Sequence, residues 1–221
     1  MKNPKPQSPY YPVTLNIQGK KCLVVGGGEV ALRKARMLLE HGANVVSISP
    51  AFCREINALA KDGAIRTIQR EYDVSDLDDA FLVIAATDNA GVNSKVAVEA
   101  RKKGILINVV DKSDISDFIV PSFFIHGDII VAVSTSGKSP ALARKIRSEI
   151  ETELKAEYAQ LAVIASDVRS ELKKKGVTVS AADWREALDL NSLIELIKRG
   201  RNKQAREIMF AKLKSATNRK P

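Results

Sequence analysis

Short apolar runs, each bounded by turn residues, recur through the first half of the chain. Such runs are typical of parallel strands that are covered on both faces. Between them lie segments with apolar residues at helical spacing, the clearest being residues 29–41. Strands and helices that alternate at these short intervals predict a Rossmann-like, doubly wound α/β sheet. The predicted strands are residues 22–25, 44–49, 65–68, 81–86 and 106–110.

The pattern changes after residue 117. Residues 121–126 and 129–134 are two apolar stretches around a Gly-Asp turn, which predicts a β-hairpin. A helix follows it, and residues 155–221 have the pattern of further helices, with breaks at Gly176 and Gly200. We therefore expect three parts, which are an α/β domain over residues 1–115, a hairpin-and-helix segment over 116–152 and a helical domain over 153–221.

A glycine turn follows the first predicted strand. Residues 26–31, GGGEVA, fit the pattern G-x-G-x-x-A of a dinucleotide-binding turn. We expect Gly26 to make the tight turn, Gly28 to let a pyrophosphate approach the backbone, and Ala31 to let helix and strand pack closely. The next helix would then point free N–H groups at the phosphate. The alternative is a glycine-rich turn that only packs tightly.

The second predicted strand lacks the acidic residue that many NAD-binding proteins use to hold the ribose. Ser47, Ser49 and Pro50 stand there instead. Backbone and hydroxyl groups could bind the ribose, so the choice between NAD and NADP stays open.

Two further groups are expected at the carboxyl ends of the strands, where open α/β sheets bind ligands. Thr87-Asp88 follows one strand, and either residue suits the N-cap of the next helix. Asp111 follows the apolar run 106–110, which predicts a partly desolvated carboxylate that could exchange a proton. The alternative for Asp111 is a loop carboxylate that only caps nearby N–H groups.

The loop at residues 135–139, TSGKS, carries several hydroxyls and Lys138. Ser139 suits the N-cap of the following helix, and Pro140 its first position. Such a helix start can bind carboxylates, although an ordinary capped helix explains the same residues. His126 lies on the hairpin, and we expect it to be structural.

Composition narrows the class of protein. An apolar fraction of 45% and a charged fraction of 28% are ordinary for a globular chain. No apolar run is long enough to span a membrane, and residues 1–6 lack the apolar core of a signal peptide, so we expect a cytoplasmic protein. We expect Cys22 to be a small buried apolar residue. Because the chain has only two histidines, and we expect no other metal ligands near Cys22 or Cys53, we assign no metal site.

The net charge of +9 is concentrated near the C-terminus, where residues 198–221 hold nine Lys or Arg and one acid. The segment lacks interleaved aromatic residues or a nucleic-acid-binding motif, so we expect no nucleic-acid partner. A solvated helix face and a site for a polyanionic small substrate both remain open.

Four segments resemble, in the same order, the dehydrogenase modules of the sirohaem-synthase family. They are Tyr11-Pro12 and Leu15 with residues 24–35, VVGGGEVALRKA; residues 85–89, AATDN, with Val92-Asn93; residues 108–111, NVVD; and residues 132–144, AVSTSGKSPALAR. The resemblance covers residues 11 to about 150. Beyond that, the chain is similar to the family only in being helical and basic.

This resemblance implies an NAD-dependent precorrin-2 dehydrogenase, which forms sirohydrochlorin on the route to sirohaem. It implies that Asp111 is catalytic and that substrate lies in a cleft between domains. It also implies a homodimer held by the hairpin and the helix after Pro140. From the resemblance and the patterns above, we expect cofactor contacts from Gly26, Gly28, Glu29, Val30, Ser49, Pro50, Ala51, Thr87 and Asp88, and substrate contacts from Ser136, Lys138 and Ser139.

Two alternatives remain open at this point. Some family members also insert iron into sirohydrochlorin, and the sequence does not decide whether this chain does. The other alternative is an NAD-sensing regulatory module, which would bind the dinucleotide without needing Asp111. The family hairpin often carries arginine where this chain has His126, which leaves the role of the hairpin tip open.

Overall fold

The computed structural model describes residues 9–217. The chain divides into two compact units, Met1–Val120 and Pro121–Pro221. The polar start at residues 1–6 and the basic residues Arg219 and Lys220 lie outside the described residues. The finer division into three parts remains a prediction.

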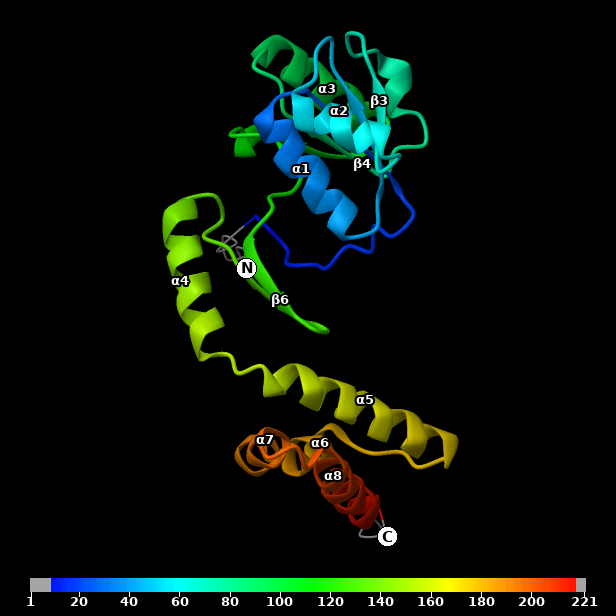
Figure 1. Cartoon of the computed structure of the whole chain (residues 1–221), viewed down its shortest axis with the longest axis vertical. Helices are drawn as coiled ribbons and strands as arrows, with labels where there is room; N and C mark the ends of the chain where they lie inside the picture. Colours follow the sequence, from blue (N-terminus) through cyan, green and yellow to red (C-terminus); the bar gives the residue numbers. More distant parts are fainter. Residues whose placement is uncertain (1–8, 218–221) are drawn as a thin grey trace, which may run out of the picture. The chain divides into compact units, whose positions relative to one another are not determined.

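The first unit, coloured from blue to green in Figure 1, is built on a parallel sheet of five strands in the order β3-β2-β1-β4-β5. This order confirms the doubly wound α/β prediction, and each strand lies within one or two residues of its predicted range. The strands are β1 (Lys21–Val25), β2 (Asn44–Ile48), β3 (Arg66–Ile68), β4 (Leu82–Ala85) and β5 (Leu106–Val109).

Helices cover both faces of this sheet. Alternate residues of β1 point to opposite faces, so that Cys22 and Val24 pack with α1 while Leu23 and Val25 pack with α3. Because both faces are covered, the strands are apolar throughout rather than alternating. One face carries α1 (Glu29–Glu40) and α2 (Arg54–Lys61), and the other carries α3 (Ala90–Lys102) and the 3₁₀ turn η1 (Val74–Leu77). A second 3₁₀ turn, η2 (Ser113–Ile115), follows β5.

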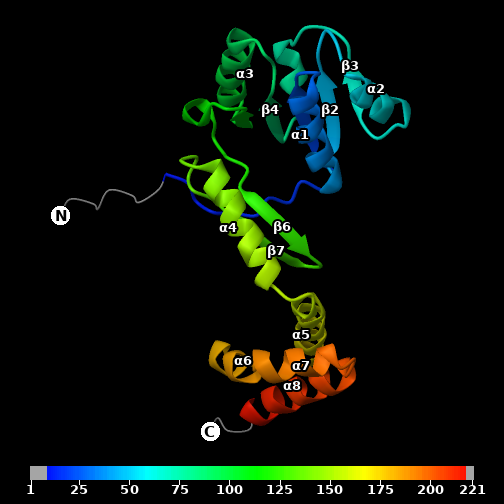
Figure 2. The same cartoon turned by 60° about the vertical axis from the view of Figure 1, so that its left-hand side comes forward.

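The second unit begins with the predicted hairpin. Its strands β6 (Ser122–His126) and β7 (Ile129–Val133) pair antiparallel, and α4 (Pro140–Glu153) packs on them. The remaining helices are α5 (Glu157–Lys174), α6 (Ala181–Ala187), α7 (Leu190–Lys198) and α8 (Asn202–Thr217). Figure 2 shows these helices lying together. They surround a core of their own, which includes Val168, Leu193 and Met209.

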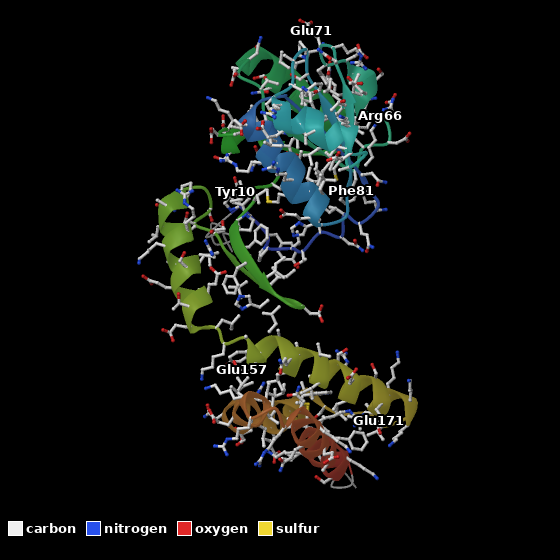
Figure 3. All side chains as sticks on the ribbon, viewed as in Figure 1. Tyr10, Arg66, Glu71, Phe81, Glu157 and Glu171 are labelled. Carbon is white, nitrogen blue, oxygen red and sulfur yellow. The ribbon has the colours of Figure 1, made fainter. Side chains whose placement is uncertain are left out.

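The predicted helix breaks are confirmed. Gly176 and Gly200 follow α5 and α7 with positive φ angles of 67° and 69°, which glycine adopts at no steric cost. On α5, Glu171 (Figure 3) accepts a hydrogen bond from Lys175 and another from Arg206 of α8, which ties the two helices together. Within residues 9–217, no helix combines the length and the apolar character needed to cross a membrane.

Candidate cofactor and active site

The candidate site begins where β1 ends between β2 and β4. Val25 is in register with Ile48 on one side and with Ala85 on the other. The chain continues from β1 to β2 on one side of this point and returns to β4 on the other. Open α/β sheets bind ligands in the crevice that forms at such a reversal. The glycine turn lies directly at this point.

Gly26 confirms its predicted role in the tight turn. Its φ angle is 137°, and a Cβ atom built on it would lie 2.4 Å from the carbonyl oxygen of Ala86. The same atom would lie 3.4 Å from Ala31 Cβ, and Ala31 is fully buried. Only glycine fits here, and the small side chain of Ala31 allows helix and strand to pack closely, as expected.

Gly27 is a constraint that the sequence pattern did not reveal. A Cβ atom on it would lie 1.9 Å from the carbonyl oxygen of Ala51. The backbone N–H of Cys53 also donates to the carbonyl oxygen of Gly27 at 2.8 Å. The glycine turn and the loop after β2 are therefore packed against each other.

Gly28 differs from its two neighbours. Its φ angle is −89°, and a Cβ atom built on it would meet no other atom within 4 Å. Gly28 is the N-cap of α1 and offers no side-chain cap, so N–H groups of the first helical turn lack the usual side-chain acceptor. This open, uncapped helix start fits an anionic group such as a pyrophosphate. Glu29 and Val30, the next residues, are exposed.

The loop after β2 corrects one expectation about the ribose. Ser47 is fully buried, and its hydroxyl donates to the carbonyl oxygen of Gly26 at 3.0 Å. It therefore stabilises the glycine turn and is not available to a ribose. Ser49 is half-buried, while Pro50 and Ala51 are exposed. A hydrogen bond of 3.3 Å from Gln69 Nε2 to the carbonyl oxygen of Pro50 holds this loop.

The segment after β4 corrects the predicted helix cap. Neither Thr87 nor Asp88 caps α3; Asn89 does, with its side-chain oxygen accepting from the N–H groups of Gly91 and Val92. Thr87 instead bonds Asn93, whose side chain is buried, through its hydroxyl at 2.7 Å and its backbone. Asp88 is exposed. The roles of Thr87 and Asp88 toward a cofactor remain predictions.

Asp111 follows β5, at the same edge of the sheet as the glycine turn. It is exposed, so the predicted partial desolvation of its carboxylate is wrong for this chain on its own. The apolar run that suggested it ends at Val109 and Val110, while the backbone of Asp111 turns into the left-handed region, with a φ of 59°. Left-handed backbone at a non-glycine residue often occurs at functional sites.

Lys34 is a residue of this edge that the sequence analysis missed. It lies on α1, is half-buried, and is close enough to Asp111 for their charges to interact. Burial, with a smaller contribution from the neighbouring charge of Arg33, lowers the pKa of Lys34, and the negative charge of Asp111 partly opposes this change. In the sequence, Lys34 stands among the apolar residues of a predicted helix, and nothing in that pattern links it to Asp111. Only the fold brings it near the end of β5.

The loop at residues 135–139 belongs to the second unit and forms an ordered turn. Ser139 caps α4 as predicted, since its hydroxyl accepts from the N–H of Leu142 at 3.3 Å. Its own N–H donates to Thr135 Oγ1 at 2.9 Å. Ser136 has a φ of 55°, and Lys138 is exposed. Substrate contacts from Ser136, Lys138 and Ser139 remain predictions.

The two cysteines differ. Cys22 is a small buried core residue, as predicted, and burial raises the pKa of its thiol to about 11. Cys53 was expected to have no potential metal ligands around it, and this is wrong. Its sulfur and the carboxylates of Glu29 and Glu55 all lie within 4.8 Å of one another, because α2 starts beside the glycine turn. Both glutamates are exposed, and we assign no metal to this group.

His126 packs against Phe124 of the same strand, with ring centroids 5.1 Å apart. Its Nδ1 atom is buried and has no hydrogen-bond partner among the described residues. The ring contact supports the expected structural role.

Comparison with known proteins identifies this arrangement. Residues 13–122 match the family model described as putative NAD(P)-binding, and residues 127–153 match that of the sirohaem biosynthesis protein central region. The chain belongs to the sirohaem-biosynthesis family. The first match ends at the start of the hairpin, and the second begins in its turn.

Family relatives agree over nearly the whole chain. The siroheme synthase of Nitrosococcus oceani is 37% identical over 206 residues, which cover 92% of this chain and 44% of that protein. The siroheme synthase of Nitrosomonas europaea is 38% identical over 215 residues, covering 96% of this chain and 45% of that protein. The chain thus spans less than half the length of these curated relatives.

A solved structure shares the fold. The precorrin-2 dehydrogenase SirC superposes with a TM-score of 0.67 at 25% sequence identity, covering 93% of this chain and 100% of that one. This likeness confirms the predicted fold class, a parallel α/β sheet followed by a hairpin and helices.

Proposed function

We propose that the chain is an NAD-dependent dehydrogenase that converts precorrin-2 into sirohydrochlorin. The observation that carries the proposal is the edge of the sheet, where an uncapped helix start at Gly28 and the exposed carboxylate of Asp111 follow strands of one continuous ladder. Family membership and the likeness to a precorrin-2 dehydrogenase supply the substrate.

The glycine turn would hold the pyrophosphate of NAD. Gly26 and Gly27 cannot carry side chains because backbone oxygens lie in the way, whereas Gly28 has open space in front of it. This contrast supports binding of a group from outside the chain at Gly28. Ser49, Pro50 and Ala51, held against the turn, would contact the adenosine side of the dinucleotide, and Glu29 and Val30 flank the phosphates.

The reaction removes a hydride and a proton from the substrate. NAD supplies the hydride acceptor when it is bound. A carboxylate oxygen of Asp111 would take the proton, because it is exposed and its backbone is fixed in a left-handed turn. The ammonium group of Lys34 attracts that carboxylate and adds positive charge at the edge that must receive a carboxylated substrate.

The hairpin and α4 support the further proposal of a homodimer. Ile125, Ile130, Leu142 and Ile150 of these elements are large apolar residues that are 37–52% exposed. A second copy of the chain would remove this surface from water. In the second unit, Lys138 would bind a substrate carboxylate. NAD and precorrin-2 both point to work in the cytoplasm, which we propose as the location.

The test is anaerobic incubation of the full chain with precorrin-2 and NAD, followed by absorbance. We expect NADH and sirohydrochlorin to appear in equal amounts. NAD binding without turnover would contradict the proposal and favour a sensing module. Parallel incubations with ferrous or cobaltous ion show whether the chain also inserts metal into its product.

A further inference from the structure

The helical part of the second unit contains an open groove that the proposed reaction does not use. It has a volume of about 910 Å³ and lies between α5, the segment that follows α5, and α6. Clefts of this size commonly receive small organic ligands. Every residue that lines the groove belongs to the second unit, so its shape does not depend on where the first unit lies.

The local sequence explains why a groove forms here. Ala162, Ala165 and Ser166 lie on one face of α5, and their small side chains leave room above the helix. Gly176, with a φ of 67°, turns the chain back along that face. The capping box of Ser180 and Asp183 then starts α6 and sets the position of Trp184 in the wall of the groove.

The polar groups of the groove suit an anion. Arg169 and Lys173, one helical turn apart on α5, line it and are exposed. Neither forms an ion pair with a described residue, and no Asp or Glu among residues 9–217 lines the groove. The indole of Trp184 is half-buried and makes no hydrogen bond to the part of the chain that the structure describes.

We infer that this groove binds a tetrapyrrole of the proposed pathway step, the substrate or the product. The inference rests on the proposed function for the identity of the ligand. A flat macrocycle would lie over the small residues of α5 and against the indole, since aromatic rings stack with an offset. Its carboxylates would pair with Arg169 and Lys173 at the rim.

Trp184 is the only tryptophan of the chain, so its fluorescence reports on this groove directly. The experiment titrates the full chain anaerobically with sirohydrochlorin and follows both tryptophan emission and bound ligand by equilibrium dialysis. Dialysis is needed because a coloured ligand can quench tryptophan from a distance. Circular dichroism first confirms that each variant is folded.

Three variants locate the binding. Ala165→Phe fills the groove, and Arg169→Gln with Lys173→Gln removes its charges. Lys174→Gln is the control, because it removes one positive charge from an exposed neighbour that does not line the groove. We expect about threefold to tenfold weaker binding for the double variant, as for two exposed charge pairs, and lower stoichiometry or affinity for Ala165→Phe. The control and the affinity for NAD should not change.

Two results would overturn the inference. One is sirohydrochlorin binding that is equal in the native chain and in both groove variants. The other is a loss of NAD affinity, in place of tetrapyrrole affinity, in the groove variants. Turnover of precorrin-2 is measured separately. If the chain turns over precorrin-2 but the groove variants bind sirohydrochlorin as the native chain does, only the groove inference is wrong. If binding depends on the groove but there is no turnover, only the proposed dehydrogenase activity is wrong.

Discussion

The two edges of the parallel sheet are built on opposite plans. At the amino ends of β1 and β4, charges are paired within the chain. The ammonium group of Lys21 donates to the carbonyl oxygens of Asp76 and Asp78 at 3.0 and 2.6 Å. The carboxylate of Asp76, which is buried, accepts two hydrogen bonds from Arg70 at 2.8 and 2.6 Å. Lys103 forms an ion pair with Asp78.

At the carboxyl ends, comparable groups are left without partners. The start of α1 has no side-chain cap, and Asp111 makes no hydrogen bond to another described residue through its side chain. Lys34 feels the charge of Asp111 without forming an ion pair with it. One sheet therefore has an edge whose polar groups stabilise the fold and an edge whose polar groups are available to ligands.

The largest effect is expected from Gly28→Asp, which should abolish NAD binding and leave the fold intact. The new side chain has room in the free chain, but its bulk and charge would oppose the pyrophosphate. Fluorescence titration measures the affinity, and thermal unfolding checks the fold. Gly28→Ala, which adds bulk without charge, is the control and should bind NAD better than Gly28→Asp. Unchanged NAD affinity in Gly28→Asp would mean that the glycine turn does not bind the pyrophosphate.

Asp111→Asn should lower turnover by about 10²–10⁴-fold, the usual contribution of a general base. Size, backbone conformation and NAD affinity should be preserved, so steady-state kinetics on a folded variant is the measurement. Asp88→Asn is the matched control, because Asp88 is also exposed at this edge and caps no helix. Equally mild effects of both substitutions would mean that the proton goes elsewhere.

The amino edge predicts an effect on stability alone. Asp76→Asn should destabilise the fold by about 1–2 kcal/mol, a value reduced because its partner Arg70 is 45% exposed. Turnover of the folded variant should not change. Asp79→Asn, an exposed change in the same segment, should cost less and serves as the control. If Asp76→Asn lowered turnover without loss of stability, the polar groups at the amino edge would do more than stabilise the fold, which would contradict the distinction between the two edges.

The same residue predicts a pH dependence. Burial alone would raise the pKa of Asp76, but hydrogen bonds from Arg70 and the backbone of Asp73, together with the charge of Arg70, lower it overall. Its ionised form therefore stabilises the fold above the ordinary Asp pKa of about 3.9, and this contribution disappears as pH falls through the lowered value. Denaturant unfolding between neutral and acid pH should show a smaller decline for Asp76→Asn than for the native chain.

The smallest effect is expected outside both edges, in the basic C-terminal segment. Neutralising Lys198, Arg199, Arg201 and Lys203 together should raise the Michaelis constant for the tetrapyrrole by a few-fold and leave that for NAD unchanged. Lys198 and Arg199 lie 3.5 and 3.9 Å from Glu195, so part of this charge is already balanced. The effect should shrink as salt shortens the Debye length below about 8 Å. Equal effects on both Michaelis constants would mean that the basic segment is only a solvated helix face.

Local signals in the sequence were enough for the elements of the fold. The apolar run at residues 22–25 and the spacing of Gly26, Gly28 and Ala31 are short-range patterns, and each element that they predicted is present. The cap of α3 was placed too early because Thr87, Asp88 and Asn89 all suit an N-cap. Only the start of the helix at Ala90 decides among them.

The site was predictable only in part, because its remaining features join segments that are far apart in the chain. The contact of Gly27 with Ala51, the bond of Ser47 to Gly26 and the approach of Lys34 to Asp111 depend on how strands stack side by side. No spacing rule within one segment contains that information. The exposure of Asp111 was missed for a related reason, since an apolar strand says little about the turn that leaves it.

The positive φ of Asp111 limits which residue types this position can accept. Asparagine and glycine adopt that backbone readily, whereas β-branched residues do not. In a lineage that is not selected for oxidation of the substrate, Asn or Gly could replace Asp111. The turn would be kept, and so would the proposed dinucleotide site. If the proposed function is right, one amino-acid substitution at Asp111 would then turn the dehydrogenase into a nucleotide sensor. A relative with Asn or Gly at this position would be a candidate for that history.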